Sequence, residues 1–267
     1  MEAFLLNTAL VLVREVESHR RHPASPTHQA RLQALERDLR WVRAQLEQDT
    51  AATLEPATRR CAMKLPTRPV SDVYGYDRGT PIDRHYIEQF LAAHAERVRG
   101  HVAEVKDDSY ARRFGGDRIR TVTVIDIDER NDQATLLADL AQPASLPEAA
   151  FDCIILTQTM QFFPNPAAAL RNCHQALRPG GSLLLTAPAV GRVSLSTPEA
   201  DCWRITPAGL ACLLGSAWIG PVTVMGYGNL RACLGMLLGE ATEELTAAEL
   251  DQHDPGYPLV ACALAER

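Results

Sequence analysis

The stretch FDCIILTQTMQFFPNPAAALRNCHQALRPGGSLLLTAP, residues 151–188, has the pattern of a strand, a helix and a second strand. A strand is predicted over residues 151–159, which are almost continuously apolar up to the polar Thr-Gln-Thr segment at their end; such a run is typical of a strand buried on both faces of a sheet. A helix is predicted over residues 165–178, and a second strand over residues 180–188. Two strands joined by a helix predict a parallel pair with a right-handed crossover.

The same alternation of strands and helices continues on both sides of this stretch. A helix is predicted over residues 206–215, with Thr206 as its N-cap and Pro207 at its first position. Further short apolar strands are predicted at residues 101–105, 120–128, 134–140, 220–228 and 257–266. The fold class predicted for residues 101–267 is therefore α/β, with a Rossmann-like, mostly parallel sheet of seven strands.

The residues before this domain show helical patterns. Residues 1–50 are predicted to form a helical hairpin or coiled-coil extension, because leucine and valine residues recur at 3-4 spacing within residues 27–48. That seam could pack on its own domain, or it could hold a homodimer or a partner subunit. Residues 51–100 are predicted to be a connector followed by a lid helix, which begins at Thr80 and ends at Gly100.

Composition excludes several classes of protein. The chain has 267 residues, 46% of them apolar, and a net charge of −6, which argues against a general nucleic-acid binder. Its seven cysteines include no CxxC pair, and its histidines are scattered, so we expect reduced thiols, a cytoplasmic location and no metal site. The apolar run near the N-terminus is too short to cross a bilayer and has no basic segment before it, so we expect neither a membrane span nor a signal peptide.

The order of these pieces resembles the class I S-adenosylmethionine-dependent methyltransferases of the type 11 kind. The resemblance covers about residues 70–265, and residues 151–188 are its most specific part. Residues 74–91, 201–206 and 253–258 also resemble a subgroup found with bacterial glycan and natural-product pathways. The resemblance implies S-adenosyl-L-methionine as cofactor and methyl transfer to a small-molecule acceptor. The alternative is a methyltransferase-like domain that has lost methyl transfer and acts as a partner subunit or hosts other chemistry.

Acidic residues at the ends of neighbouring strands suit a nucleoside, because a carboxylate can accept hydrogen bonds from both ribose hydroxyls. The resemblance implies Asp128 for the ribose, with Asp126 behind it on the same face of the strand. It implies that Asp139 and Leu140 meet the edge of the adenine. Thr157 and Gln158 lie near the end of the predicted strand over residues 151–159 and are expected to line the mouth of the site.

The turn after the first strand departs from the family pattern, in which an acid is followed by three spaced glycines. Glu104 supplies the acid, but Lys106, Asp108 and Tyr110 occupy the three glycine positions. The Lys106 ammonium could pair with Glu104, Asp107 or the carboxylate of the cofactor. Alternatively, it could fill the pocket and exclude the cofactor. Glu104, Lys106 and Asp107 are predicted to belong to the cofactor site.

The residues expected to contact the methyl acceptor lie before the predicted Rossmann-like domain and near its end. His85 and His253 are candidate general bases, because imidazole takes up a proton near neutral pH. Tyr76, Arg78 and Tyr86 are predicted to form an acceptor wall or lid, although Arg78 could instead pair with Asp77. A nicotinamide dehydrogenase is disfavoured, because no GxGxxG motif follows a strand.

Overall fold

The computed structural model describes residues 11–13, 16, 33, 35–40, 42 and 66–267. The described residues before residue 66 are helical, and the remainder of the predicted hairpin lies outside the described residues. Most of the seam at residues 27–48 and residues 51–65 of the connector also lie outside them. Residues 66–267 form a compact unit that begins at Pro66, so the predicted lid helix belongs to the same unit as the sheet.

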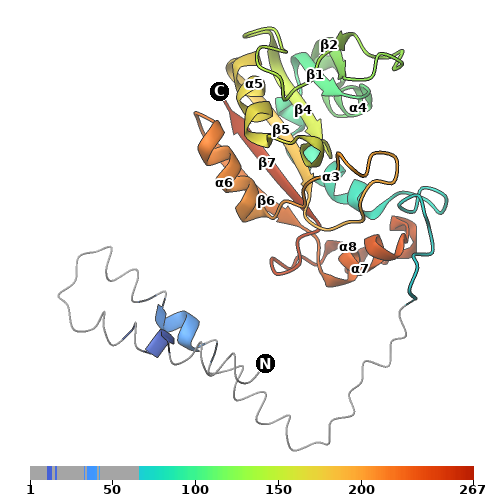
Figure 1. The fold of residues 1–267 in the computed structure, drawn as a ribbon, viewed down its shortest axis with the longest axis vertical. Coiled ribbons are helices and arrows are strands. Elements are labelled where there is room, and N and C mark those ends of the chain that lie inside the picture. The colour runs from blue at the N-terminus through green and yellow to red at the C-terminus, as the bar shows by residue number, and fades with distance from the viewer. Residues whose placement is uncertain (1–10, 14–15, 17–32, 34, 41, 43–65) are drawn as a thin grey trace, which may run out of the picture. The chain divides into compact units, whose positions relative to one another are not determined.

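This unit is built on a seven-stranded mixed sheet with the strand order β3-β2-β1-β4-β5-β7-β6 (Figure 1). The strands are β1 Gly100–Val105, β2 Ile119–Asp126, β3 Leu136–Leu137, β4 Phe151–Thr157, β5 Leu177–Pro188, β6 Val222–Tyr227 and β7 Val260–Glu266. Strands β1 to β5 run parallel, whereas β7 lies antiparallel to both β5 and β6. The predicted α/β, Rossmann-like sheet of seven strands is confirmed.

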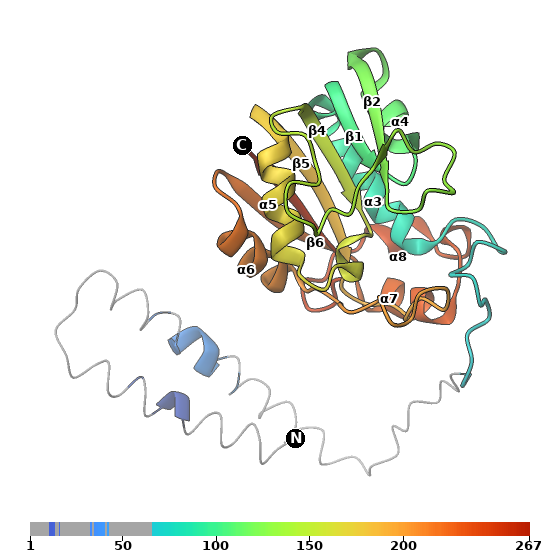
Figure 2. The ribbon, with the colours of Figure 1, turned by 45° about the horizontal axis from the view of Figure 1, so that its top comes forward.

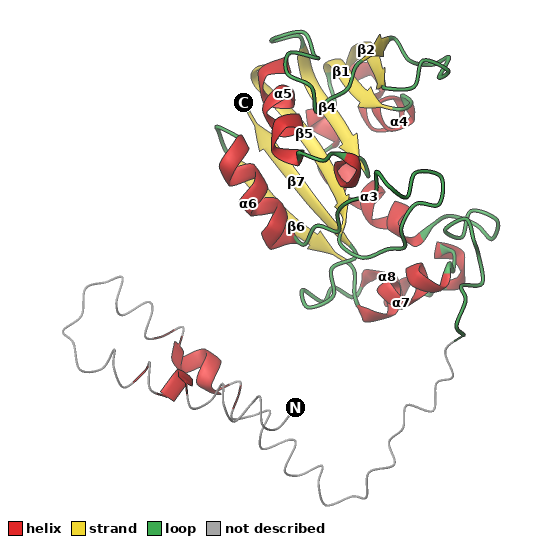
Figure 3. Cartoon of the chain, viewed as in Figure 1, coloured by secondary structure: helices red, strands yellow, loops and turns green. Residues whose placement is uncertain are grey.

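Helices cover both faces of the sheet and complete three layers (Figures 2 and 3). One face packs against α5 Pro166–Ala176 and α6 Pro207–Ala217. The other packs against α3 Ile82–Ala93, α4 Ser109–Gly115, α7 Leu230–Leu238 and α8 Ala247–Asp251. Four short 3-10 helices connect these elements: η1 Ala95–Arg97, η2 Gly116–Arg118, η3 Met160–Phe162 and η4 Thr242–Glu244.

The burial of strand β4 explains the apolar run at residues 153–156. Ile154 and Leu156 point into the core beneath α5 and α6, whereas Cys153 and Ile155 point into the core beneath α3 and α7. All four side chains are fully buried. Because neighbouring residues of a strand face opposite sides, burial on both faces requires an unbroken apolar run.

The Pro-Gly-Gly segment lies inside a strand and not ahead of it. Helix α5 ends at Ala176, two residues earlier than predicted, and β5 begins at Leu177. Phe151 is paired with Leu177, but Cys153 is paired with Ser182, so the segment between these pairs bulges out of the ladder. Gly180 has a φ of 78°, which favours glycine at this point of the bulge.

Several predicted boundaries were wrong. The helix after Thr80 ends at Ala93, and Pro81 precedes it and forms an isolated bridge with Ala241. Gly100 begins β1 and does not end that helix. Helices α4, α7 and α8 were not predicted, although Asn229 and the capping box of Thr246 and Glu249 mark the starts of α7 and α8.

Among the described residues, no helix is long and apolar enough to cross a membrane.

Candidate functional site

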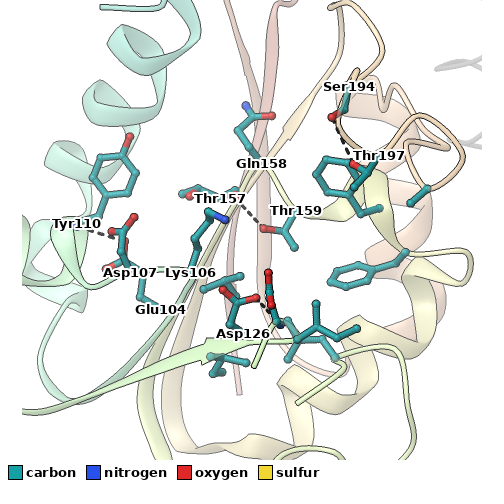
Figure 4. A pocket seen from close by; sticks show the side chains of 18 of the residues that line it. Glu104, Lys106, Asp107, Tyr110, Asp126, Thr157, Gln158, Thr159, Ser194 and Thr197 are labelled. Atoms are coloured by element: carbon teal, nitrogen blue, oxygen red, sulfur yellow. Dashed lines mark hydrogen bonds between the residues drawn. The ribbon is translucent and has the colours of Figure 1, made fainter. Parts of the chain in front are cut away.

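A cleft of about 1230 Å³ lies at the edge where the parallel strands β1, β2 and β4 end. Ligands of doubly wound sheets bind at this edge, where the order of the strands reverses. The cleft is lined by nine of the predicted site residues: Tyr76, Glu104, Lys106, Asp107, Asp128, Asp139, Leu140, Thr157 and Gln158. Figure 4 shows how several of these side chains converge on it. His85, His253, Arg78 and Tyr86 do not line it.

Glu104 holds the turn between β1 and α4 in place. Its carboxyl group is buried and accepts hydrogen bonds from the backbone N–H groups of Tyr110 (3.2 Å) and Ala111 (2.6 Å). Burial raises the pKa of Glu104 to about 8, against the opposing effect of these two donors. Both oxygens are thus engaged in shaping the first turn of α4.

Lys106 adopts a backbone conformation that favours glycine, with a φ of 81°. Its N–H donates to Ile125 on β2 at 2.9 Å, so the turn is pinned to the neighbouring strand. The side chain is directed into the cleft (Figure 4), and its ammonium group has no ion-pair partner among residues 66–267. The predicted pairing with Glu104 or Asp107 is therefore not present; Asp107 instead accepts from Ser109 N–H at 2.9 Å.

The two acids at the end of β2 differ in their surroundings. Asp126 is the last residue of β2, and it accepts from Asp128 N–H at 3.0 Å and from Asn131 Nδ2 at 2.6 Å. Burial opposes its ionisation, but these donors outweigh burial and lower the pKa of Asp126. Asp128 lies beyond the strand, where Arg130 donates to both of its oxygens at 2.8 Å and lowers its pKa to about 2.

The loop after β3 presents Asp139 and Leu140 to the cleft. Asp139 Oδ1 accepts from the N–H of Ala141 at 2.9 Å, which fixes the carboxylate at the start of the loop. Leu140 is buried, its carbonyl accepts from Asn172 at 2.8 Å, and its N–H has no acceptor within residues 66–267. A carboxylate beside a free backbone donor matches the edge of a purine that carries an amino group.

The turn after β4 is held in an unusual shape. Gln158 has a φ of 47°, and its N–H donates to Thr186 on β5 at 3.0 Å. Thr159 Oγ1 donates to the carbonyl of Thr157 at 2.8 Å, which tightens the turn. Non-glycine residues held at positive φ often mark functional sites. Figure 4 shows the side chain of Gln158 directed away from Lys106.

The remaining predicted residues lie elsewhere. Tyr86 is buried in the core, and its hydroxyl donates to the carbonyl of Leu250 at 2.9 Å. Arg78 pairs with Glu244 and not with Asp77, so it fixes the connector to η4. His85 lies edge-on to Tyr86, and His253 is exposed on the loop before β7. The structure does not bring these four side chains into the cleft.

Sequence reasoning missed Arg84, the neighbour of His85. Its guanidinium lines the cleft and donates to the hydroxyls of Tyr76 at 3.2 Å and Tyr110 at 3.3 Å. Successive helix residues point about 100° apart, so Arg84 faces the cleft while His85 does not. The sequence pattern that could have indicated the orientation of Arg84 is the buried face of α3, which Ile82 and Tyr86 mark.

No group of three or more His, Cys, Asp or Glu side chains that could hold a metal ion occurs in the part of the chain that the structure describes.

Comparison with known proteins finds a family that part of this chain is similar to. Residues 102–185 match the model of a methyltransferase domain family. No curated protein matches the sequence. Solved structures with a similar fold include an S-adenosylmethionine-dependent methyltransferase from Archaeoglobus fulgidus, at 12% identity over 69% of this chain and 94% of that one, with a TM-score of 0.47. A second, from Mesorhizobium loti, is 18% identical over 72% of this chain and all of that one (100%), with a TM-score of 0.45.

The matched segment runs from β1 to β5 and therefore contains the turn at Lys106, both acids of β2 and the turn at Gln158. Residues 102–185, which carry these features on a Rossmann-like sheet, are thus similar to a methyltransferase domain family, and S-adenosylmethionine is the cofactor that this similarity implies.

Proposed function

We propose that the chain transfers the methyl group of S-adenosylmethionine to a small-molecule acceptor in a bacterial natural-product or glycan pathway. The observation that supports this most directly is the convergence of Asp126, Asp139 and the free N–H of Leu140 on one cleft. These groups lie at the ends of adjacent parallel strands, where an adenosine would be gripped at both its ribose and its base. The pathway rests on the sequence resemblance alone.

The residues of the cleft fit the cofactor at the nucleoside. We assign the ribose to Asp126 rather than to Asp128, because Asp128 is ion-paired through both oxygens with Arg130, whereas Asp126 accepts only from the neutral donors Asp128 N–H and Asn131 Nδ2. We assign the adenine to Asp139 and Leu140. Thr157 and Gln158 line the mouth beside the methionine part, and Glu104 and Asp107 shape the turn below it.

When bound, the cofactor supplies an activated methyl group on a positively charged sulfur. The residues of this chain then have to hold the acceptor in line with that methyl group and exclude water, which is worth several kcal/mol of the barrier. The cleft has the volume for both molecules, since ligand pockets commonly measure about 300–1000 Å³. The candidate bases His85 and His253 would need to move to reach such an acceptor, because neither lines the cleft.

Lys106 favours a second candidate function. Its unpaired ammonium group projects into the cleft, where a cationic sulfonium would be repelled unless the carboxylate of the cofactor lies between them. A chain in which this charge excludes the cofactor would be a methyltransferase-like partner subunit, with residues 27–48 as the docking element. That segment lies largely outside the described residues.

Calorimetry distinguishes the two candidates. We expect the full chain to bind S-adenosylmethionine and S-adenosylhomocysteine with micromolar dissociation constants. Absence of binding in the full chain, with binding gained in the Lys106→Gly variant, would support the partner-subunit function. Absence in both proteins would contradict the assignment of the cleft to this cofactor.

A further inference from the structure

A second, smaller cavity of about 240 Å³ adjoins the cleft. The two cavities share six lining residues: Tyr76, Pro81, Arg84, Gln158, Phe162 and Ser194. Its volume is below the range of about 300–1000 Å³ for whole ligand pockets, so it can hold one ring or a group of similar size. The second cavity therefore opens beside the turn at Gln158, next to the proposed site of methyl transfer.

Three residues that line the second cavity each carry a buried polar atom without a hydrogen-bond partner. These atoms are Oδ1 of Asp83, Nε2 of Gln158 and Oε1 of Gln161. The orientation of the Gln161 amide is fixed, because its Nε2 donates to the carbonyl of Gln158 at 2.8 Å. Among the described residues, only six buried side-chain atoms lack a partner, and half of them belong to residues that line this one cavity.

Such atoms are costly unless a ligand satisfies them. A buried polar atom without a partner costs about 1–3 kcal/mol, and native structures contain few of them. Gln158 adds a positive φ at the same place. Three residues with unsatisfied atoms around one cavity, one of them in a strained conformation, indicate a binding site for a polar ligand.

The charges around the second cavity set the chemistry of that ligand. Asp83 and Arg84 are neighbours of opposite charge that both line it. The other two lining arginines are paired, Arg204 with Asp201 at 2.6 Å and Arg192 with Asp72 at 3.6 Å. Burial raises the pKa of Asp83, and the Arg84 guanidinium opposes that shift. The unsatisfied atoms are two acceptors and one donor. A ligand that complements these atoms offers at least two hydroxyl donors and one acceptor and carries no net charge.

We propose that the second cavity binds the hydroxyl-rich head of the methyl acceptor, with the size and hydrogen-bonding groups of a single sugar or cyclitol ring. Asp83 and Gln161 accept hydrogen bonds from its hydroxyls, and Gln158 donates to one of its oxygens. Tyr74 and Tyr76 line the cavity as well and supply apolar surface for the carbon skeleton of the ring. This inference rests on the proposed methyl transfer, because it identifies the second cavity as the acceptor site of that reaction.

Ligand-observed NMR tests the proposal with the full chain and saturating S-adenosylhomocysteine. The probes are myo-inositol and methyl β-glucoside, with cyclohexanol as a probe of similar ring size and one hydroxyl. We expect saturation transfer to the two hydroxyl-rich probes and at least fivefold less to cyclohexanol. The Asp83→Asn and Gln161→Leu variants should each weaken the hydroxyl-rich signals at least fivefold, whereas Gln175→Leu, on an exposed residue of α5, should leave them unchanged.

Binding of S-adenosylhomocysteine is measured separately in every protein. If the nucleoside binds and neither hydroxyl-rich probe gives a signal, the second cavity is not a sugar site, although the proposed function stands. Equal signals from Asp83→Asn, Gln161→Leu and the parent chain would overturn the proposal in the same way. If the parent chain did not bind S-adenosylhomocysteine, that result would instead count against the proposed function.

Discussion

The carbonyl oxygen of Lys106 accepts a hydrogen bond from Nδ2 of Asn131 at 2.7 Å. The same amide nitrogen donates to Oδ2 of Asp126 at 2.6 Å. One side chain thus joins the turn after β1 to the acid at the end of β2. These are two of the features that the proposed cofactor site needs.

Replacing Asn131 with alanine should loosen both features at once. We expect the free energy of unfolding to fall by about 0.5–1.5 kcal/mol, because two partly exposed acceptors lose their donor. Binding of S-adenosylhomocysteine should weaken about tenfold. Urea denaturation and calorimetry measure the two effects. Gln133→Ala, on an exposed residue of the same loop, is the control, and an equal loss of binding there would contradict the prediction.

Lys106 should affect stability through its backbone and binding through its charge. A left-handed conformation costs a side chain about 1–2 kcal/mol, part of which glycine regains. Lys106→Gly should therefore be more stable to urea than Lys106→Met by about 1 kcal/mol. Equal stabilities would show that the positive φ of 81° carries no strain.

Both Lys106 variants lack the ammonium group, so both should favour the cationic cofactor. We expect the affinity for S-adenosylmethionine to rise relative to that for neutral S-adenosylhomocysteine, and the ratio to change most at low salt. Titration calorimetry at two salt concentrations provides the measurement. If the ratio of the two affinities were the same in Lys106→Met as in the parent chain, the Lys106 ammonium group would lie away from the sulfur of the cofactor.

Glu104 should make stability depend on pH. The pKa of its carboxyl group is about 8 in the folded chain, against an ordinary value of 4.5. Between these values the folded state holds a proton that the unfolded state has released, so the free energy of unfolding should fall as pH rises from about 4.5 to about 8 and should level off above that. Glu104→Gln should flatten this part of the profile. Exposed Glu129→Gln is the control and should leave the slope unchanged.

The two acids of β2 should contribute unequally to nucleoside binding. Asp126→Asn should weaken S-adenosylhomocysteine binding by tenfold or more, because the ribose hydroxyls lose a charged acceptor. Asp128→Asn should cost less than threefold, since Arg130 already engages both oxygens of Asp128. Calorimetry on both variants decides the assignment, and the reverse order of losses would restore Asp128 as the ribose ligand.

Strand and cap patterns were sufficient to predict the sheet. The apolar run of β4 and the β-branched residues of β2 reflect burial, which local sequence records directly. Thr206 caps α6 by accepting from Gly209 N–H, with Pro207 at the first position, as predicted. Short helices such as α4 left weaker patterns, and the bulge at Gly180 depends on pairing with β4, which no local pattern contains.

The site was predictable only where it follows from topology. Acids at strand ends meet at one edge of any parallel sheet, and Asp126, Asp128 and Asp139 all line the cleft. The face of α3 that reaches the cleft was not predictable. Arg84 and His85 are consecutive residues, and a rotation of about 100° around the helix decides which of them faces the cleft. Nor was the partner of Arg78, since Glu244 is 166 residues away along the chain.

Strand β7 has a consequence for how the molecule is made. It lies between β5 and β6, where its residues Val260–Ala263 are fully buried, yet it is the last of the seven strands to be synthesised. During synthesis on the ribosome, the edges of β5 and β6 that pair with β7 stay unpaired until β7 emerges, and unpaired strand edges favour aggregation. Nascent chains that stop short of β7 should therefore depend on chaperones, whereas completed chains should not.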